Sequence, residues 1–176
     1  MAELVIRDAT PADIPHLHAL VESAYRGEAS RAGWTTEADL LDGQRTDAED
    51  LASILSDTEQ GMLTAWDGEA LVGCILIARR GEGIGYFGML SVSPTLQNAG
   101  LGRRLVALGE QTMADRFGAR RVRISVIPQR DTLIAWYERL GYVATGDTLP
   151  FPYGDARFGL PKREDLSFVV MEKTLR

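Results

Sequence analysis

The sequence is poor in the residues that form disulfides and metal centres. It contains one cysteine, Cys74, and two histidines among its 176 residues. A single cysteine cannot form an intrachain disulfide or a cysteine-based zinc site. The histidines, His16 and His18, are two positions apart on a predicted helix, so their side chains point to different faces and do not form a metal pair. We therefore expect neither a disulfide nor a metal site.

Long hydrophobic runs are also absent. The longest, LVGCILIA at 71–78, is less than half as long as a membrane-spanning helix. The first residues, MAELVIRD, carry acidic side chains where a secretory signal peptide has basic residues and then a long apolar stretch. We therefore expect a soluble, cytoplasmic protein with no membrane partner. Its length and composition fit a single domain over residues 1–176.

The chain has too little positive charge for nucleic acid to be a general partner. Its formal net charge is −6 at pH 7, whereas phosphate binding needs concentrated lysine and arginine. Acidic residues dominate between positions 28 and 59, and arginines dominate between 103 and 123. One hypothesis is that the acidic segment attracts a cationic amine. The alternative is that both runs are solvated helix surfaces.

Local signals along the chain predict a mixed α+β fold. Asp67-Gly68 stands between two apolar runs, which predicts a hairpin, and the next run, IGYFGMLSV, extends it to a three-stranded antiparallel meander. A strand-helix-strand crossover is expected in the middle of the chain. Strands are predicted at about 3–8, 62–67, 69–79, 84–92, 121–127, 141–146 and 165–175, with helices at about 11–25, 46–57, 101–117 and 132–140.

Several residues predict where the helices begin and end. Serine, threonine and aspartate are favoured at the first cap position because their side chains accept hydrogen bonds from free backbone N–H groups. Glycine is favoured just after a helix because it adopts left-handed backbone angles. The predicted N-terminal caps are Thr10, Thr46 (in a capping box with Glu49) and Asp131, and the predicted terminating glycines are Gly118 and Gly141.

Two glycines mark the start of the third helix, in the stretch SVSPTLQNAGLGRRLVALGEQ at 91–111. Glycine costs about 1 kcal/mol relative to alanine inside a helix, so Gly100 and Gly102 suggest that another group comes close to the backbone. The helix after them carries a predicted buried stripe of Leu101, Leu105 and Leu108. A glycine turn that opens a helix is suited to an anion such as a pyrophosphate. The alternative is a helix start with glycines for close packing.

Two familiar phosphate-binding motifs do not fit this turn. A Walker A motif requires lysine and then serine or threonine after its last glycine, whereas Gly102 is followed by Arg103-Arg104. The dinucleotide fingerprint requires a third glycine where this chain has Leu105. It also requires an acidic residue at the end of the next strand, which this chain lacks. A nucleophilic serine motif, G-x-S-x-G, is absent as well.

The same turn resembles a motif of the GNAT N-acetyltransferase superfamily. Val92-x-Pro94 followed by QNAGLG at 97–102 is similar to the family's V-x-P and Q/R-x-x-G-x-G/A pattern. A second block, LIAWYERLGY at 133–142, resembles the family's later Tyr-Glu-Lys/Arg-x-Gly-Phe/Tyr ending. The resemblance runs from about residue 62 to 142. It implies a GNAT-like acyltransferase fold with a central, mostly antiparallel sheet of six to seven strands, a strand-helix-strand cofactor crossover and about four flanking helices.

The resemblance further implies that acetyl-CoA binds as cosubstrate, with no metal. The family's pyrophosphate contacts fall on the backbone of the turn and on the arginine after it, and its pantetheine contacts fall on a strand that borders a V-shaped gap in the sheet. Arg130 stands where many members carry a cofactor-contacting asparagine, and an arginine there could reach a phosphate or a carbonyl. The implied cofactor-binding residues are Leu90, Ser91, Val92, Gln97, Asn98, Ala99, Gly100, Leu101, Gly102, Arg103 and Arg130.

By the same resemblance, Tyr137 is the catalytic residue that assists departure of the CoA thiolate, and a backbone N–H at or near Leu90 stabilises the developing oxyanion. From the residues alone, Tyr137 belongs to an apolar stripe with Trp136 and Leu140 and is expected in the core. The general base stays open between a chain of water molecules and four acidic residues, Glu28, Glu37, Asp39 and Asp155.

The acceptor site is expected in the two irregular segments, 27–45 and 151–161, which carry aromatic and charged residues: Trp34, Phe151, Tyr153, Arg157 and Phe158. The alternative for the second segment is a loop that covers the sheet edge. The expected function is acetyl transfer to a primary amine of a small molecule or peptide. A non-catalytic acyl-CoA-binding or sensory domain is the competing hypothesis. A homodimer is left open.

Overall fold

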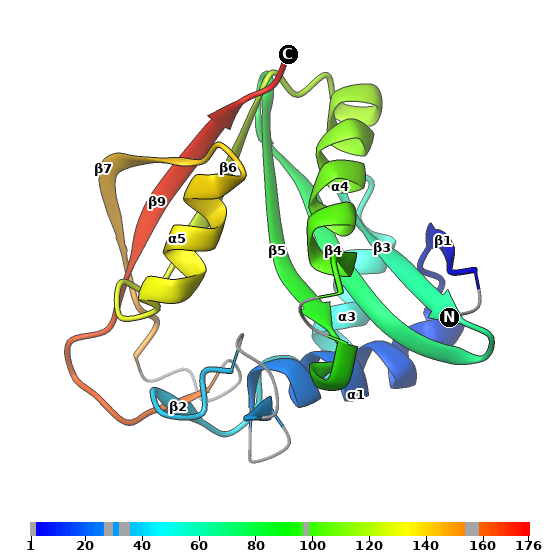
Figure 1. The fold of residues 1–176 in the computed structure, drawn as a ribbon, viewed down its shortest axis with the longest axis horizontal. Coiled ribbons are helices and arrows are strands. Elements are labelled where there is room, and N and C mark those ends of the chain that lie inside the picture. Colours follow the sequence, from blue (N-terminus) through cyan, green and yellow to red (C-terminus); the bar gives the residue numbers. More distant parts are fainter. Residues whose placement is uncertain (1–2, 27–29, 32–35, 97–98, 154–158) are drawn as a thin grey trace.

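The computed structural model describes residues 3–26, 30–31, 36–96, 99–153 and 159–176. In these residues a seven-stranded mixed sheet has the order β1-β3-β4-β5-β6-β9-β7 (Figure 1). Its strands are β1 (Val5–Asp8), β3 (Gln60–Asp67), β4 (Ala70–Gly81), β5 (Ile84–Val92), β6 (Arg121–Val126), β7 (Val143–Pro150) and β9 (Ser167–Thr174). The helices are α1 (Ile14–Tyr25), α3 (Ala48–Ser56), α4 (Leu101–Phe117) and α5 (Asp131–Arg139), with short 3₁₀ turns η1 (Pro11–Asp13) and η2 (Pro94–Leu96).

This architecture confirms the predicted α+β class. Neighbouring strands are antiparallel except β5 and β6, which are parallel and joined through α4. The hairpin at Asp67-Gly68 joins β3 to β4, and Gly68 has the positive φ of +60° that such a tight turn requires. The meander β3-β4-β5 is therefore present as predicted.

Helices cover both faces of the sheet, and β4 contributes side chains to the hydrophobic core on each face. Because successive side chains of a strand point to opposite faces, Ile75 and Ile77 join the core beneath α4 and α5, whereas Cys74 and Leu76 join the core beneath α1 and α3. Figure 1 shows α4 and α5 on the near side of the sheet. The two layers of helices therefore enclose β4 between them.

The sheet opens between β5 and β6. Their parallel pairing runs only from Ile84 opposite Arg121 to Tyr86 opposite Arg123, although β5 continues to Val92. At the same level β5 contains a bulge against β4, where Met89 has a φ of +48°. Bulges increase the local twist and turn a strand away from its neighbour. The second half of β5 therefore lacks β6 as a partner, which places the gap where the family resemblance implies it.

Two of the three predicted helix caps were wrong by one residue. The cap of α3 is Asp47, whose side chain accepts a hydrogen bond of 2.7 Å from the Asp50 N–H, because Asp47 is one residue closer to the helix than the predicted Thr46. Asp131 is the first residue of α5 and not its cap, which is Arg130 without a side-chain bond. Thr10 is an N-cap as predicted, and it forms a capping box with Asp13, but the helix it begins is the 3₁₀ turn η1, which leads into α1.

The predicted buried stripe of α4 also needs correction. Leu101 and Leu105 are buried, but Leu108 is 36% exposed. The helix instead turns Gly109 toward β4, where a Cβ would lie only 3.2 Å from the side chain of Ile75. The helix therefore approaches the sheet most closely at a glycine, and Leu108 lies at the edge of this contact, partly exposed to solvent. The predicted ends at Gly118 and Gly141 are confirmed, with φ of +64° and +100°.

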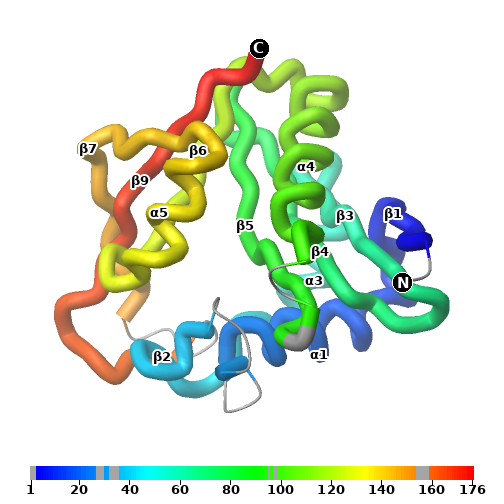
Figure 2. Tube along the Cα trace, in the orientation of Figure 1, coloured from blue at the N-terminus to red at the C-terminus, as the bar shows by residue number. Residues whose placement is uncertain are grey.

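A second, two-stranded sheet joins the segments in which the acceptor site was expected. β2 (Leu41–Asp42) pairs antiparallel with β8 (Leu160–Pro161). Lys162 strengthens the link, since its backbone N–H donates to the Leu40 carbonyl and its Nζ donates to the Ala38 carbonyl at 2.7 Å. Figure 2 shows β2 near the end of α1, below the space between β5 and α5. Two segments far apart in sequence thus close one end of the gap.

Candidate active site

A cavity of about 340 Å³ occupies the opening between β5 and β6. One wall is the half of β5 beyond Tyr86, which does not pair with β6, and the opposite wall is the end of β6 with α5. The end of α1 and the segments around β2 and β7 close it. Its lining includes Tyr25, Arg26, Glu37, Leu41, Arg45, Tyr86, Phe87, Met89, Leu90, Ser125, Ile127, Arg130, Tyr137, Phe151 and Phe168. Segments from most of the chain therefore meet at one place.

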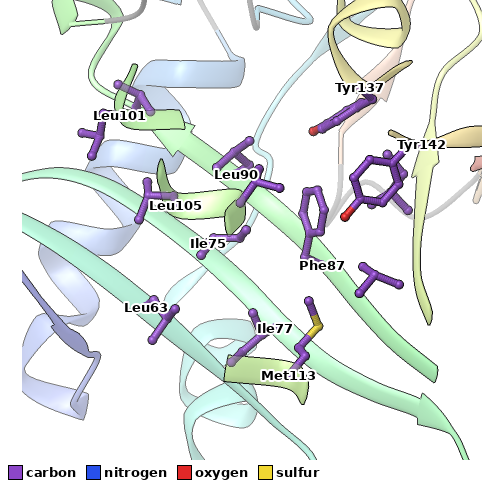
Figure 3. Close-up of a cluster of buried hydrophobic side chains, with 14 of the residues drawn as sticks. Leu63, Ile75, Ile77, Phe87, Leu90, Leu101, Leu105, Met113, Tyr137 and Tyr142 are labelled. Carbon is purple, nitrogen blue, oxygen red and sulfur yellow. The ribbon is translucent and has the colours of Figure 1, made fainter. Parts of the chain in front are cut away.

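Tyr137 faces this cavity from α5. Its side chain is 6% exposed and packs edge-on against Phe87 and Tyr142, with ring centres 5.8 and 6.0 Å away. In Figure 3 its hydroxyl oxygen lies on the side of the ring that faces β5 and Leu90. Among the described residues that hydroxyl has no hydrogen-bond partner. Burial, reinforced by Tyr25, raises the pKa of Tyr137 well above its ordinary value, so the hydroxyl stays protonated and can donate.

The bulge of β5 is held by hydrogen bonds to its carbonyl groups. Tyr25 donates its hydroxyl proton to the Leu90 carbonyl, and Ser91 Oγ donates to the Met89 carbonyl at 3.0 Å. Leu90, Ser91 and Val92 are all buried, and β4 pairs with Ser91 and Val92 from one side only. The strand therefore presents a fixed backbone edge to the cavity side, where an extended ligand could pair with it.

The glycine turn before α4 has two different requirements. Gly100 has a φ of +85°, which glycine adopts without steric cost. Gly102 has ordinary helical geometry, and a Cβ there would lie 3.7 Å from Trp136 and 3.8 Å from Val92, which is normal contact. Backbone conformation therefore explains Gly100, whereas no described neighbour requires glycine at 102.

The structure describes residues 99–104 of this turn and of the helix start that follows it. Ala99 and Gly100 are exposed and border a second cavity of about 280 Å³ together with Leu101 and Arg104. Arg103 is exposed and does not line either cavity. Of the predicted cofactor-binding residues, Gln97 and Asn98 lie outside the described residues.

Arg130 belongs to a buried charge cluster that the sequence analysis missed. It donates to Glu37 Oε2 at 3.0 Å, and Arg26 donates to Glu37 Oε1. The exposed fraction of the side chain is 10% for Arg130, 9% for Glu37 and 4% for Arg26. Burial alone would raise the pKa of Glu37, but Arg130, Arg26 and Arg45 together hold it below its ordinary value. Glu37 is therefore an ionised anchor for arginines, which makes it a weak proton acceptor.

The other predicted acceptor-site residues are divided. Phe151 lines the cavity and stacks on Phe168 with ring centres 5.7 Å apart. Tyr153 is 44% exposed and donates its hydroxyl proton to the Arg163 carbonyl, away from the cavity lining. The side chain of Asp39 is 80% exposed and pairs with Arg31. Five predicted residues lie outside the described residues: Glu28, Trp34, Asp155, Arg157 and Phe158.

Tyr25 and Arg26 complete the cavity without having been predicted, and Arg45 is the last residue of the segment 27–45 in which the acceptor site was expected. Arg45 and Arg130 both lie over the Tyr25 ring, each with its guanidinium carbon 5.6 Å from the ring centre. Nothing in the sequence distinguishes Tyr25-Arg26 from other residues near a helix end. The pairing of Glu37 with Arg130 joins positions 93 residues apart, which no local pattern reports.

The described ranges contain no group of three or more His, Cys, Asp or Glu side chains placed to hold a metal ion. Within the same ranges, none of the helices combines the length and the apolar composition that a membrane crossing needs.

Comparison with known proteins agrees with the geometry. A segment of 84 residues, 48% of this chain, is 33% identical to mycothiol acetyltransferase from Corynebacterium efficiens, and it spans 28% of that protein's length. The chain thus covers less than a third of this relative.

Solved structures resemble the whole chain. The ribosomal-protein-S18-alanine N-acetyltransferase from Escherichia coli is 15% identical with a TM-score of 0.70, over 98% of this chain and 94% of that one. A GNAT family acetyltransferase from Elizabethkingia anophelis with acetyl-CoA bound is 16% identical with a TM-score of 0.69, over 99% and 100%. At these identities the likeness establishes the fold.

The family assignment follows from a direct sequence match. The family model described as acetyltransferase (GNAT) family matches residues 18–142, well over half of the chain. The match includes the glycine turn, Tyr137 and the end of α1 that carries Tyr25. It confirms the resemblance read from the two sequence motifs: this chain belongs to the GNAT acetyltransferase family.

Proposed function

We propose that the protein transfers an acetyl group from acetyl-CoA to a primary amine of a small molecule or peptide, by direct attack of the amine on the thioester. The observation that carries the proposal is the Tyr137 hydroxyl, which faces the cavity beside the unpaired half of β5 and has no hydrogen-bond partner among the described residues. Membership in an acetyltransferase family supports the reaction class.

The cosubstrate fits the features of the gap. The backbone of Leu90, Ser91 and Val92 would hold the pantetheine arm as an added strand, since the pairing of β5 with β6 ends at Tyr86. The N–H groups at the start of α4 would hold the pyrophosphate, because they lack partners within the helix and lie at its positive end. Gly102, for which no described neighbour gives a reason, leaves room for that approach. Arg103 and Arg104 are both exposed next to it.

Tyr137 would act on the leaving sulfur. A buried phenol with a raised pKa is fully protonated at neutral pH, so it is always ready to donate a hydrogen bond. Transfer of its proton to a thiolate, whose conjugate acid has a pKa of about 8.5, is uphill. Tyr137 therefore stabilises negative charge on sulfur by hydrogen bonding as that charge develops, which favours the transition state over the bound thioester. The N–H of Leu90 would stabilise the acetyl oxygen.

The acceptor amine enters from the opposite side of the cavity, between β2 and β7. Arg130 is committed there to Glu37 at 3.0 Å, so we assign it to the acceptor end and not to the pyrophosphate. Glu37 itself is held ionised by arginines, which disfavours it as general base. Asp39 is exposed and paired with Arg31, which disfavours it as well.

The test is the conservative substitution Tyr137→Phe, which keeps the ring and removes the hydroxyl. We expect kcat for an acetylated amine to fall by about 100-fold, the range of a positioned acid, with little change in acetyl-CoA affinity. The control is Tyr142→Phe, which removes the hydroxyl of a neighbouring buried tyrosine that bonds to Glu110 at 2.8 Å and does not line the cavity. It should lower stability and leave turnover per folded molecule unchanged.

The competing hypothesis is a domain that binds acyl-CoA without turnover. Calorimetry with acetyl-CoA and a panel of amines, amino acids and peptide N-termini separates the two hypotheses. Acetyl-CoA binding without acetylation of any acceptor supports the binding domain. Equal kcat in Tyr137→Phe and the unaltered protein would remove Tyr137 from the mechanism.

A further inference from the structure

The charged side chains around the cavity are mostly positive. Arg26, Arg45 and Arg130 line it, with Glu37 as the one acidic side chain among its described lining residues. Among the described lining residues, three guanidinium groups and one carboxylate leave two positive charges in excess. The acidic residues between 28 and 59 were expected to attract a cationic amine, but of those that the structure describes only Glu37 faces the cavity.

The single carboxylate is already occupied. Glu37 accepts from Arg26 with one oxygen and from Arg130 with the other. Arg45 uses its backbone N–H to donate to Glu22 Oε1 at 2.7 Å, while its guanidinium lies over the Tyr25 ring. Within the part of the chain that the structure describes, this guanidinium has no hydrogen bond or ion pair. A charged group in such a setting is suited to an external anion.

Tyr25 places this arginine at a short distance from the reaction site. Its hydroxyl bonds to the Leu90 carbonyl, beside the strand edge proposed for the thioester, and its ring carries both Arg45 and Arg130. One tyrosine side chain therefore spans the distance between the two ends. A single small molecule could place an amine at Leu90 and Tyr137 while its anionic group reaches the arginines.

We propose that the acceptor is an amine that also carries a carboxylate, such as an amino acid, and that Arg45 with Arg130 binds the carboxylate. The proposal rests on the acetyltransferase function above. A carboxylate accepts paired N–H donors from guanidinium groups in a planar fork, and it would neutralise one of the two excess charges. Leu41, Ile127, Phe151 and Phe168 line the same end of the cavity, which favours an apolar side chain on the acceptor.

The first experiment measures binding without turnover. N-acetyl-L-leucine and N-acetyl-L-leucinamide differ only in the carboxylate, and neither carries an amine charge. In calorimetric titrations with CoA present, we expect the acid to bind the unaltered protein at least about tenfold more tightly than the amide, as one hydrogen-bonded charge pair provides. Arg45→Gln should remove this preference, whereas Arg45→Lys, which keeps the charge, should retain part of it.

The matched control is Arg79→Gln. Arg79 pairs with Glu59 at 3.6 Å on the surface and does not line the cavity, so its loss removes one positive charge elsewhere. This variant should keep the full preference for the acid. Circular dichroism and thermal unfolding of each variant confirm that the comparison is made on folded protein.

The second experiment measures turnover of L-leucine and L-leucinamide with acetyl-CoA. Arg45→Gln should raise the KM for leucine by about tenfold or more and change the KM for acetyl-CoA little. Equal binding of the acid and the amide, no binding of either, or a preference that survives Arg45→Gln would overturn the carboxylate proposal. Acetylation of amines without that preference leaves the acetyltransferase assignment standing, whereas failure to bind acetyl-CoA removes both.

Discussion

Replacing Glu37 with glutamine should destabilise the protein strongly, because one buried anion serves two buried cations. Its carboxylate bonds to Arg26 and to Arg130, and all three side chains are 10% exposed or less. Glu37→Gln would remove the carboxylate that both guanidinium groups share, and it would also remove the negative charge near Arg45. Arg130→Gln is less disruptive, since Glu37 then still has Arg26.

The expected size follows from burial. Removing one partner of a buried ion pair costs about 3–5 kcal/mol because the other charge is left unpaired and desolvated. We expect Glu37→Gln to lower the free energy of unfolding by about 3 kcal/mol or more, which for a chain of this length lowers Tm by about 10 °C. Native proteins are stable by about 5–15 kcal/mol in total, so the variant should still fold at low temperature.

The chain contains a matched control on its surface. Glu172 also serves two arginines, with 3.3 Å to Arg121 and 2.7 Å to Arg123, but its side chain is 21% exposed and the arginines are 46% and 42% exposed. Glu172→Gln should therefore cost only about 0–1 kcal/mol. Urea denaturation followed by tryptophan fluorescence measures both variants. If Glu37→Gln costs no more than Glu172→Gln, solvent reaches the cluster and the reasoning from desolvation is wrong.

Two further predictions concern other parts of the fold. Gly102→Ala should leave the free energy of unfolding unchanged or raise it by up to about 1 kcal/mol, since alanine suits a helix and its Cβ would meet Trp136 at an ordinary 3.7 Å. Calorimetry should nevertheless show weaker binding of acetyl-CoA to this variant. Gln111→Ala on the same helix is the control and should not weaken that binding. Unchanged affinity in Gly102→Ala would contradict the pyrophosphate assignment. Asp13 accepts two hydrogen bonds from Arg7, and these lower the pKa of Asp13 to about 2. Because this folded-state pKa is below that of the unfolded chain, the stabilisation by Asp13 is present above about pH 4. It is lost as the pH falls toward 2. Asp13→Asn should accordingly cost about 2 kcal/mol in urea denaturation at pH 7, and a difference from the unaltered protein that stays constant down to pH 2 would contradict this.

The sequence predicts the elements whose signals are local. The hairpin at Asp67-Gly68 and the helix ends at Gly118 and Gly141 depend on backbone angles that glycine adopts readily, so a few adjacent residues determine them. Caps were predicted one residue away, at Thr46 and Asp131, because several neighbouring residues could act as caps and only the path of the preceding chain selects one.

The candidate site was predicted where a family motif marks it and, in part, from the irregular segments 27–45 and 151–161, whose Leu41, Arg45 and Phe151 line the cavity. The motif ending at Tyr142 identified Tyr137, and the glycine turn identified the start of α4. The pairing of β2 with β8 and of Glu37 with Arg130 joins distant positions whose side chains have no distinctive spacing. Those pairings determine which charges reach the cavity. Among the described acidic residues of the segment 28–59, only Glu37 lines the cavity as a result.

The excess of arginine also bears on how the acceptor amine loses its proton. An amine must be neutral to attack a thioester, and neighbouring positive charges lower the pKa of an amine because they disfavour its protonated form. With a carboxylate bound to Arg45, one of the two excess charges would be neutralised and one would remain beside the amine. Glu37 cannot reverse this effect, since Arg130 and Arg26 occupy both of its oxygens. If the proposed amine binds there, the positive charge of the described lining residues would favour its nucleophilic form, and its proton could leave to solvent without a dedicated carboxylate base.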